Sequence, residues 1–176
     1  VKKIVLNACG VKSLGGLKLF LESFDFFSKT DSKIFVLYSE IEFYKDLNNQ
    51  FYENPRVKFY KTTNKRYLHP FLNYFLPNKI VEEINNSDAI IHFGNFGFKT
   101  LKKSFVLIQN ILPLVKRGIR NSILKVLINR SMKLSNFILI QLDHLKEDID
   151  KKFHSKIIQI GETTSSEVKI LSLIHI

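Results

Sequence analysis

The first thirty residues combine the backbone features with which many folds bind an anion. The short apolar segment Val1–Asn7 has the character of a buried strand. The following loop ends in the pair Gly15-Gly16, and the amphipathic segment Leu17–Phe27 has the spacing of a helix. Glycines let a ligand approach the backbone, and the free N–H groups of a helix N-terminus favour negative charge. The segment predicts an anion site, although Gly15-Gly16 would equally make a tight connection.

Predicted strands and helices alternate along the rest of the chain. Seven short segments are mostly continuous apolar runs, which is typical of strands buried on both faces of a parallel sheet. Helical spacing separates several of them, at 17–27, 70–85, 118–134 and 142–153. This alternation predicts an α/β fold: a Rossmann-like, doubly wound, mostly parallel sheet of about seven strands. The predicted strands are Lys3–Asn7, Lys33–Tyr38, Arg56–Tyr60, Asp88–Phe93, Ser104–Gln109, Asn136–Gln141 and Lys156–Ile160.

The helical segments carry apolar residues at a spacing that predicts buried stripes. Pro77 is expected to interrupt the segment at 70–85. The aromatic residues near that segment would be either core or an interfacial patch, and core is the simpler interpretation. The expected stripe members are Ile119, Ile123, Val126, Leu127 and Leu134; Leu142, Leu145, Ile149 and Phe153; and Tyr67, Phe71, Tyr74 and Phe75.

Polar residues and glycines follow the predicted strands. In open α/β sheets, ligands bind at the carboxyl ends of the strands, so this rim predicts a ligand cleft. The acceptor-side candidates are His92, Asn95, Gln109 and Asn110. His92 ends a buried strand and is more simply a core histidine, with ligand contact second. Asn95 and Asn110 would equally be ordinary turn residues.

Several catalytic and cofactor motifs are absent from the sequence. The glycines after the first strand lack the dinucleotide spacing, and Gly10–Gly16 lacks the lysine and hydroxyl of a phosphate-binding P-loop. There is no serine nucleophile elbow, and the histidines lack metal-ligand spacing. The single Cys9 excludes a disulfide framework. We therefore expect no cofactor and no metal, and the catalytic residues stay unassigned.

The net charge of +11 favours acidic partners, although an AT-rich genome would give the same lysine-rich composition. A local cluster, Lys116, Arg117 and Arg120, predicts a basic face for a membrane or a lipid-linked acceptor. A solvated helix face is the alternative. The longest apolar stretch, Phe105–Val115, is too interrupted to span a bilayer. We expect a cytoplasmic protein, with the inner face of the membrane as a candidate surface.

The order of these segments resembles the N-terminal, acceptor-side half of a GT-B glycosyltransferase. The resemblance rests on the strand, Gly-Gly and helix at the start, followed by four later pieces in order. Within GT-B enzymes, it is most similar to the retaining family 4 group of bacterial polysaccharide and lipopolysaccharide biosynthesis. The four pieces are Ser87–Asn95, Phe105–Asn110, Leu134–Gln141 with the helix to Phe153, and Lys156–Gly161.

The resemblance implies transfer of a hexose from a sugar nucleotide, as donor substrate, to a lipid-linked or surface glycan. Gly15 and Gly16 would approach the donor diphosphate. Two positions depart from the family pattern: Gln109-Asn110 stands at the end of the fifth strand, where the family often carries a histidine, and Gln141 ends the sixth strand, where serine is usual. The donor-binding C-terminal domain of the family is not in the sequence, so this chain alone is expected to be inactive.

Two other functions remain open from the sequence. A sugar-nucleotide epimerase of the same two-domain shape would bind a UDP-sugar without an acceptor. A non-catalytic basic module would bind nucleic acid, but no nucleic-acid signature is present and we expect no such partner.

The C-terminal residues predict a boundary. We assign residues 1–161 to the domain and 162–170 to the start of an interdomain linker. Leu171–Ile176 resembles a translated transposon adapter used in DNA library preparation, and we expect it to be non-native. The natural protein would then continue past Ile170.

Overall fold

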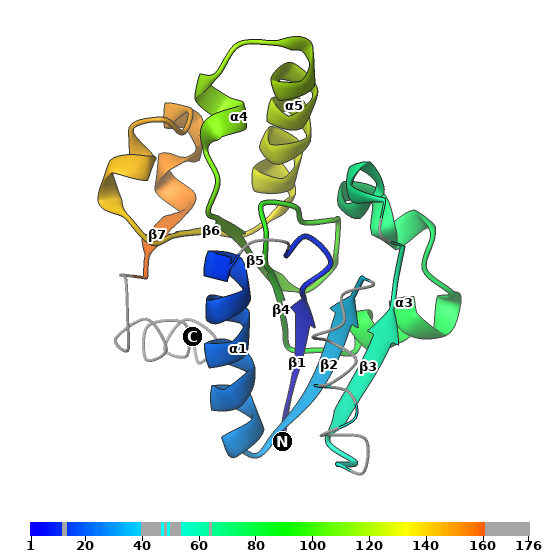
Figure 1. Ribbon diagram of the computed structural model, residues 1–176. Helices are drawn as coiled ribbons and strands as arrows, with labels where there is room; N and C mark the ends of the chain where they lie inside the picture. Colours follow the sequence, from blue (N-terminus) through cyan, green and yellow to red (C-terminus); the bar gives the residue numbers. More distant parts are fainter. Residues whose placement is uncertain (12–13, 40–46, 48, 50–53, 64, 161–176) are drawn as a thin grey trace.

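The computed structural model describes residues 1–11, 14–39, 54–63 and 65–160, together with positions 47 and 49. Seven parallel strands form one sheet in the order β3-β2-β1-β4-β5-β6-β7 (Figure 1). This is the predicted Rossmann-like α/β fold, and each predicted strand lies within one or two residues of its observed bounds. The strands are β1 (Lys2–Asn7), β2 (Ser32–Tyr38), β3 (Val57–Lys61), β4 (Ala89–His92), β5 (Lys103–Ile108), β6 (Phe137–Ile140) and β7 (Ile157–Gln159). The predicted linker and tail at 162–176 lie outside the described residues.

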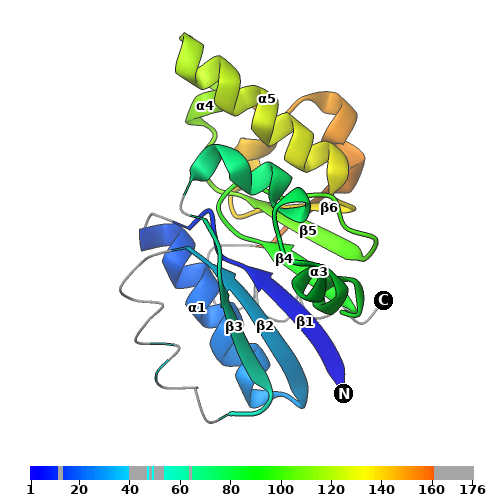
Figure 2. The same ribbon diagram turned by 90° about the vertical axis from the view of Figure 1, so that its right-hand side faces the viewer.

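Helices cover both faces of the sheet (Figures 1 and 2). Helix α1 (Leu14–Lys29) packs on one face. The 3₁₀ helix η1 (Arg66–Tyr74) and helix α3 (Asn78–Asn85) lie on the other face, beside α5 (Ile119–Leu134). The chain breaks between η1 and α3 at Pro77, as predicted, because proline cannot continue a helix.

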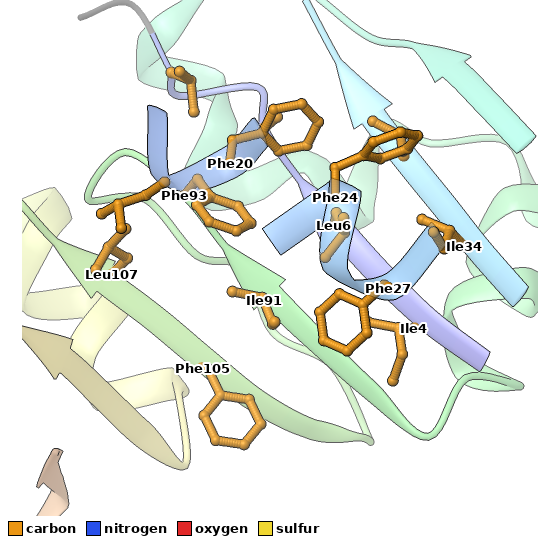
Figure 3. Close-up of a cluster of buried hydrophobic side chains, with 14 of the residues drawn as sticks. Ile4, Leu6, Phe20, Phe24, Phe27, Ile34, Ile91, Phe93, Phe105 and Leu107 are labelled. Carbon is orange, nitrogen blue, oxygen red and sulfur yellow. The ribbon is translucent and has the colours of Figure 1, made fainter. Parts of the chain in front are cut away.

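Phenylalanines of α1 form the centre of one core layer (Figure 3). Phe20, Phe24 and Phe27 are almost fully buried over the apolar side chains of β1, β2 and β4. The ring of Phe20 meets Phe93 edge-on at 5.6 Å between centroids. Each buried phenylalanine contributes on the order of 2 kcal/mol, so this layer fixes α1, and hence its amino end, against the sheet.

The glycine pair does not lie in the predicted loop. Helix α1 begins at Leu14, so Gly15 and Gly16 occupy its first turn. The sequence prediction started the helix at Leu17 because glycine weakens a helix interior. In the first turn that cost matters less, because the backbone N–H groups there have no intrahelical partner in any case.

The segment 142–153 is not one continuous helix. It forms two short 3₁₀ helices, η2 (Asp143–Lys146) and η3 (Lys151–Lys156). Asp150 is extended, and its carboxylate accepts a hydrogen bond from the backbone N–H of Lys152 at 3.1 Å. This local bond caps a new helix and competes with continuation of the first. Leu145, Ile149 and Phe153 are nevertheless buried as predicted.

Two of the predicted buried stripes were wrong in most of their members, although the predicted Leu127 is buried. In α5 the residues that face the sheet are Leu124, Leu127, Ile128 and Met132, whereas Ile119, Ile123 and Val126 are exposed. The spacing of i, i+4 and i+7 defines a stripe but does not say whether the sheet covers it. Around η1 the aromatic residues Tyr67, Tyr74 and Phe75 are exposed, and Phe71 is half-buried.

Candidate functional site

The strand order reverses between β1 and β4, and we call this place, at the carboxyl ends of the two strands, the switch point. Open α/β sheets bind ligands at such a reversal. From β1 the chain moves outward to β2 and β3, then returns to β4 on the other side of β1. Both strands are parallel, so their carboxyl ends meet at one edge. Asn7 pairs in register with His92 at that edge, and the loops that leave these residues carry most of the predicted site.

Two glycines let the loops after β1 and β4 touch. A Cβ on Gly10 would lie 2.8 Å from the carbonyl oxygen of Gly94, and a Cβ on Gly94 would lie 2.5 Å from Gly10 carbonyl atoms. Gly94 also has a φ of +83°, which side-chain-bearing residues rarely adopt. Only glycine fits at both positions, so backbone packs directly on backbone at the switch point.

Beneath this contact lies a buried polar pair. The Nδ2 of Asn7 lies 2.9 Å from Nδ1 of His92, and neither side chain is exposed. Since an amide nitrogen only donates, His92 accepts at Nδ1 and carries its proton on Nε2. Burial lowers the pKa of His92 to about 3, so it stays neutral near pH 7.

The pair positions the loop after β1. The Oδ1 of Asn7 accepts a hydrogen bond of 3.3 Å from the backbone N–H of Cys9. The ring of His92 packs edge-on against Phe98 at 4.8 Å, and its Cδ2 occupies the space beside Gly97. The geometry therefore agrees with the core interpretation of His92, while ligand contact by this residue stays a prediction.

Cys9 is not suited to be a nucleophile. Its thiol is buried, and desolvation raises its pKa to about 12. Its Sγ lies 2.9 Å from Oγ1 of Thr62, at the start of the loop after β3. A thiol that keeps its proton near pH 7 has little nucleophilicity, so Cys9 packs and bonds but does not react.

The first turn of α1 faces a side chain from the far side of the switch point. A Cβ added to Gly16 would lie 2.6 Å from Oε1 of Gln109, which follows β5. Gly15 is exposed, and nothing lies within 4 Å of the position that its Cβ would take. The structure thus brings the predicted donor glycine Gly16 beside the predicted acceptor-side residue Gln109, with Gly15 open to solvent.

Asn95 holds the loop that carries Gln109 and Asn110. Its Oδ1 accepts from the backbone N–H of Gln109 at 2.8 Å and of Asn110 at 3.2 Å. Its Nδ2 donates to the carbonyl of Asn110 at 2.6 Å, and its own φ is +72°. The side chain is buried and its hydrogen-bonding atoms are engaged, so the structure gives Asn95 a positioning role.

The amide of Asn110 also bonds within its own loop. Its Oδ1 accepts from the backbone N–H of Leu112 at 3.0 Å, where the short helix α4 (Leu112–Val115) begins. Asn110 is exposed and Gln109 is half-buried. Both residues lie at the carboxyl edge as predicted, and their contact with an acceptor stays a prediction.

The predicted basic face lies on the connection from α4 to α5. Lys116, Arg117 and Arg120 are all exposed there. At the opposite, amino edge of the sheet a cavity is lined by Lys3, Lys58 and Glu83, among others. Hydrogen bonds from Lys3 and then Lys58 lower the pKa of Glu83, so this cavity is an ion-paired structural feature far from the switch point.

The sequence did not reveal the residues that hold the loops together at the carboxyl edge of β1 and β4. Asn7 and the Gly10–Gly94 contact were visible only as polar or glycine residues after strands. Their roles follow from the pairing of β1 with β4, which joins segments about 85 residues apart in the chain. Within the described residues, no group of histidine, cysteine and carboxylate side chains could hold a metal ion.

The fold matches known structures, although the sequence matches none. No protein-family model matches the chain, and no curated protein does. The structure of Arabidopsis thaliana UGT89C1 with UDP-L-rhamnose superposes with a TM-score of 0.50 and 11% identity, over 96% of this chain and 55% of that one. The same protein with UDP gives a TM-score of 0.49 and 12% identity, over 93% and 49%.

The likeness shows a shared architecture. The seven-stranded parallel sheet with flanking helices is the Rossmann-like fold of these GT-B neighbours. This chain spans about half the length of UGT89C1. At 11% identity the superposition shows a shared fold, and it does not assign a substrate or a catalytic residue to this chain.

Proposed function

We propose that this chain is the acceptor-side half of a glycosyltransferase that moves a hexose from a sugar nucleotide to a glycan. The observation that carries the proposal is the first turn of α1. Its open Gly15 lies at the carboxyl edge of a sheet whose architecture is shared with a protein solved with UDP-L-rhamnose. The retaining, family 4-like assignment, and a lipid-linked or surface glycan as acceptor, belong to the same proposal.

The chemistry assigned to this half is positioning and electrostatics. The backbone N–H groups at the start of α1 have no intrahelical partner, and the helix dipole adds partial positive charge there. A diphosphate that accepts hydrogen bonds from these groups would be stabilised as it departs with its negative charge. The loop held by Asn95 would present Gln109 and Asn110 to sugar hydroxyls on the acceptor side.

A second domain would complete the site. In the proposal it supplies the cations and most of the nucleotide contacts, so this chain alone binds UDP weakly and does not turn over. No metal or cofactor enters the proposal, and the sugar nucleotide is a substrate.

The binding half of the proposal can be tested on this chain by NMR. The protein has seven glycines, whose amide signals are separated from most others. Titration with UDP should shift the amides of Gly15 and Gly16 and leave Gly118, on the α4–α5 connection, unchanged. Shifts spread over the basic surface without saturation would show non-specific anion binding and would contradict the donor site.

Two alanine variants separate donor contact from loop positioning. Gly15→Ala meets no atom within 4 Å and replaces glycine in a helix, so stability should rise by up to about 1 kcal/mol while UDP binding weakens. Gly16→Ala should instead displace Gln109. Unchanged UDP binding by Gly15→Ala would reduce the glycine pair to a structural turn.

In the proposal, the transfer reaction needs a protein in which this chain is joined to a donor-binding domain. That protein should transfer radiolabelled hexose from UDP-hexose to an endogenous lipid extract, and Gly15→Ala should lower its kcat/KM. Release of an epimerised sugar nucleotide without transfer would support the epimerase instead. Rapid turnover by the 176-residue chain alone would contradict the two-domain requirement.

A further inference from the structure

Helices α4 and α5 expose several large apolar side chains. Ile119 is 84% exposed and Val126 is 66% exposed. With Ile123, they form one stripe at i, i+4 and i+7 on the side of α5 that does not face the sheet. Leu112 and Val115 of α4 are also about half exposed. We call these five residues the α4–α5 apolar surface.

Helices α4 and α5 and their connection contain no aspartate or glutamate, but they carry six cations: Lys116, Arg117, Arg120, Lys125, Arg130 and Lys133. Carboxylates lie to one side of the two helices, where Glu147, Asp148 and Asp150 line a pocket together with Leu114 and Lys125. Lys116, Arg117 and Arg120 directly flank the apolar surface and are exposed. Among the described residues, none of these three forms a salt bridge with a carboxylate.

The α4–α5 connection is a structured projection. Figures 1 and 2 show α4 and the amino-terminal end of α5 extending beyond the carboxyl ends of the strands. The Nζ of Lys125 donates to the carbonyl of Leu114 at 3.1 Å, and Leu114 and Leu124 are buried in the same cluster. The exposed side chains are therefore presented on a packed helical hairpin that protrudes from the domain.

We propose that the α4–α5 apolar surface docks on an anionic lipid bilayer. Apolar side chains would enter the interface between headgroups and acyl chains, and the three cations would lie at the level of the lipid phosphates. The surface fits nucleic acid poorly, because its centre is aliphatic and carries no ring on which a base could stack. It also fits a second copy poorly, since two copies would bring like charges together.

Docking on a bilayer would bring the protein to a lipid-linked acceptor. The binding to lipid stands by itself, and only the presence of that acceptor rests on the proposed function. Vesicle binding at α5 and UDP binding at Gly15 involve different residues. Each measurement can therefore fail without the other.

The first test measures flotation of the 176-residue chain with vesicles. The chain should bind vesicles of phosphatidylcholine and phosphatidylglycerol, and bind phosphatidylcholine alone much more weakly. Ile119→Ser combined with Ile123→Ser and Val126→Ser should weaken binding about 100-fold, because three apolar side chains no longer leave water. Leu101→Ser, which removes another exposed leucine just before β5, is the matched control and should bind normally.

The second test removes charge. Lys116→Gln, Arg117→Gln and Arg120→Gln together should weaken binding to the anionic vesicles by about 100-fold at low salt. The difference from the parent should shrink in high salt, because exposed charges are screened over about 10 Å at 0.1 M. The control replaces three exposed lysines outside α4 and α5, Lys33, Lys79 and Lys99, with glutamine. It lowers the net charge by the same amount and should bind the vesicles more tightly than the test variant.

Circular dichroism melts should be the same for the apolar variant, the charge variant and the parent, since the changed side chains are exposed. Equal vesicle binding by the apolar variant and the parent would overturn the proposal. So would a dimer that the serine substitutions abolish, because the surface would then be a self-interface. Tight, charge-dependent DNA binding without vesicle binding would assign the basic residues to nucleic acid instead.

Discussion

The switch point and the α4–α5 projection use glycine and polar residues in opposite ways. At the switch point, Gly10 and Gly94 bring backbone against backbone, and Asn7 hydrogen-bonds to Nδ1 of His92 out of contact with water, while the buried Nε2 of His92 has no partner among the described residues. On the projection, Gly118 has positive φ with no atom within 4 Å of its Cβ position, and the cations around it are exposed. The difference indicates that one region fixes geometry while the other is available to a partner.

The two positive-φ glycines should respond differently to alanine. Gly94→Ala adds a Cβ 2.5 Å from Gly10 to an already strained φ, so unfolding free energy should fall by about 4 kcal/mol. Gly118→Ala carries only the conformational strain and should cost about 2 kcal/mol. Urea denaturation followed by circular dichroism measures both. Equal losses would show that the Gly10–Gly94 contact yields easily, and would remove the contrast between the two regions.

The buried histidine predicts a specific loss of stability in weak acid. His92 has a pKa of about 3 in the folded chain and 6.5 unfolded, so protonation favours the unfolded state. Its stabilising effect is complete above pH 6.5 and is lost as the pH falls toward 3. Between pH 6.5 and 5 the unfolding free energy should drop by about 2 kcal/mol. His92→Leu should be less stable but should lose this dependence; the same slope in the variant would place the titrating group elsewhere.

Loss of the Asn95 side-chain hydrogen bonds, which clamp the loop at Gln109 and Asn110, should have an intermediate effect on unfolding free energy. Asn95→Ala leaves two backbone N–H groups and one carbonyl without their partner, and unfolding free energy should fall by about 1.5 kcal/mol. Asn95→Asp keeps the acceptor for both N–H groups and loses only the donor, so it should lie between alanine and the parent. Chemical denaturation gives the order, and hydrogen exchange at the Gln109 amide should report local opening. A parent-like exchange rate in Asn95→Ala would show that the loop holds without the clamp.

The smallest effect is expected on the projection itself. Ile123→Asn changes an exposed side chain and should alter unfolding free energy by less than about 0.5 kcal/mol. The neighbouring Leu124→Asn places an amide in the core and should destabilise the fold by several times that amount. Thermal melts of the two variants give the comparison. A large loss from Ile123→Asn would mean that the stripe is structural, and the docking surface would need another explanation.

The strands were predictable from the sequence because both faces of this sheet are covered. Ile4, Val5 and Leu6 are successive residues with no exposure, so the run of apolar letters directly reflects burial. Helix faces were less predictable. In α5 the apolar residues occupy two sides, and the sequence cannot show that only the side with Leu124 and Ile128 meets the sheet.

The candidate site was likewise predictable in part. The glycine pair and the residues after β4 and β5 were found, because glycine and asparagine after a strand are local signals. The bonds that organise them were not, because Asn7 meets His92 only through a strand pairing distant in sequence, and Asn95 serves the loop after the next strand. Gly15 and Gly16 were placed in the wrong element, since the weak helix propensity of glycine hid the true start of α1.

The position of β1 in the sheet also has a consequence for synthesis of the chain. One edge of β1 pairs with β2, which is complete by residue 38, but the other edge pairs with β4, which is complete only at residue 92. A nascent chain that has formed β1, β2 and β3 therefore exposes a strand with an apolar centre, Ile4–Leu6, and with unpaired N–H and C=O groups. Such an edge is a template for pairing with another chain. Translation speed and chaperones acting between residues 61 and 92 should thus influence the yield of this protein more than changes after β4 is in place.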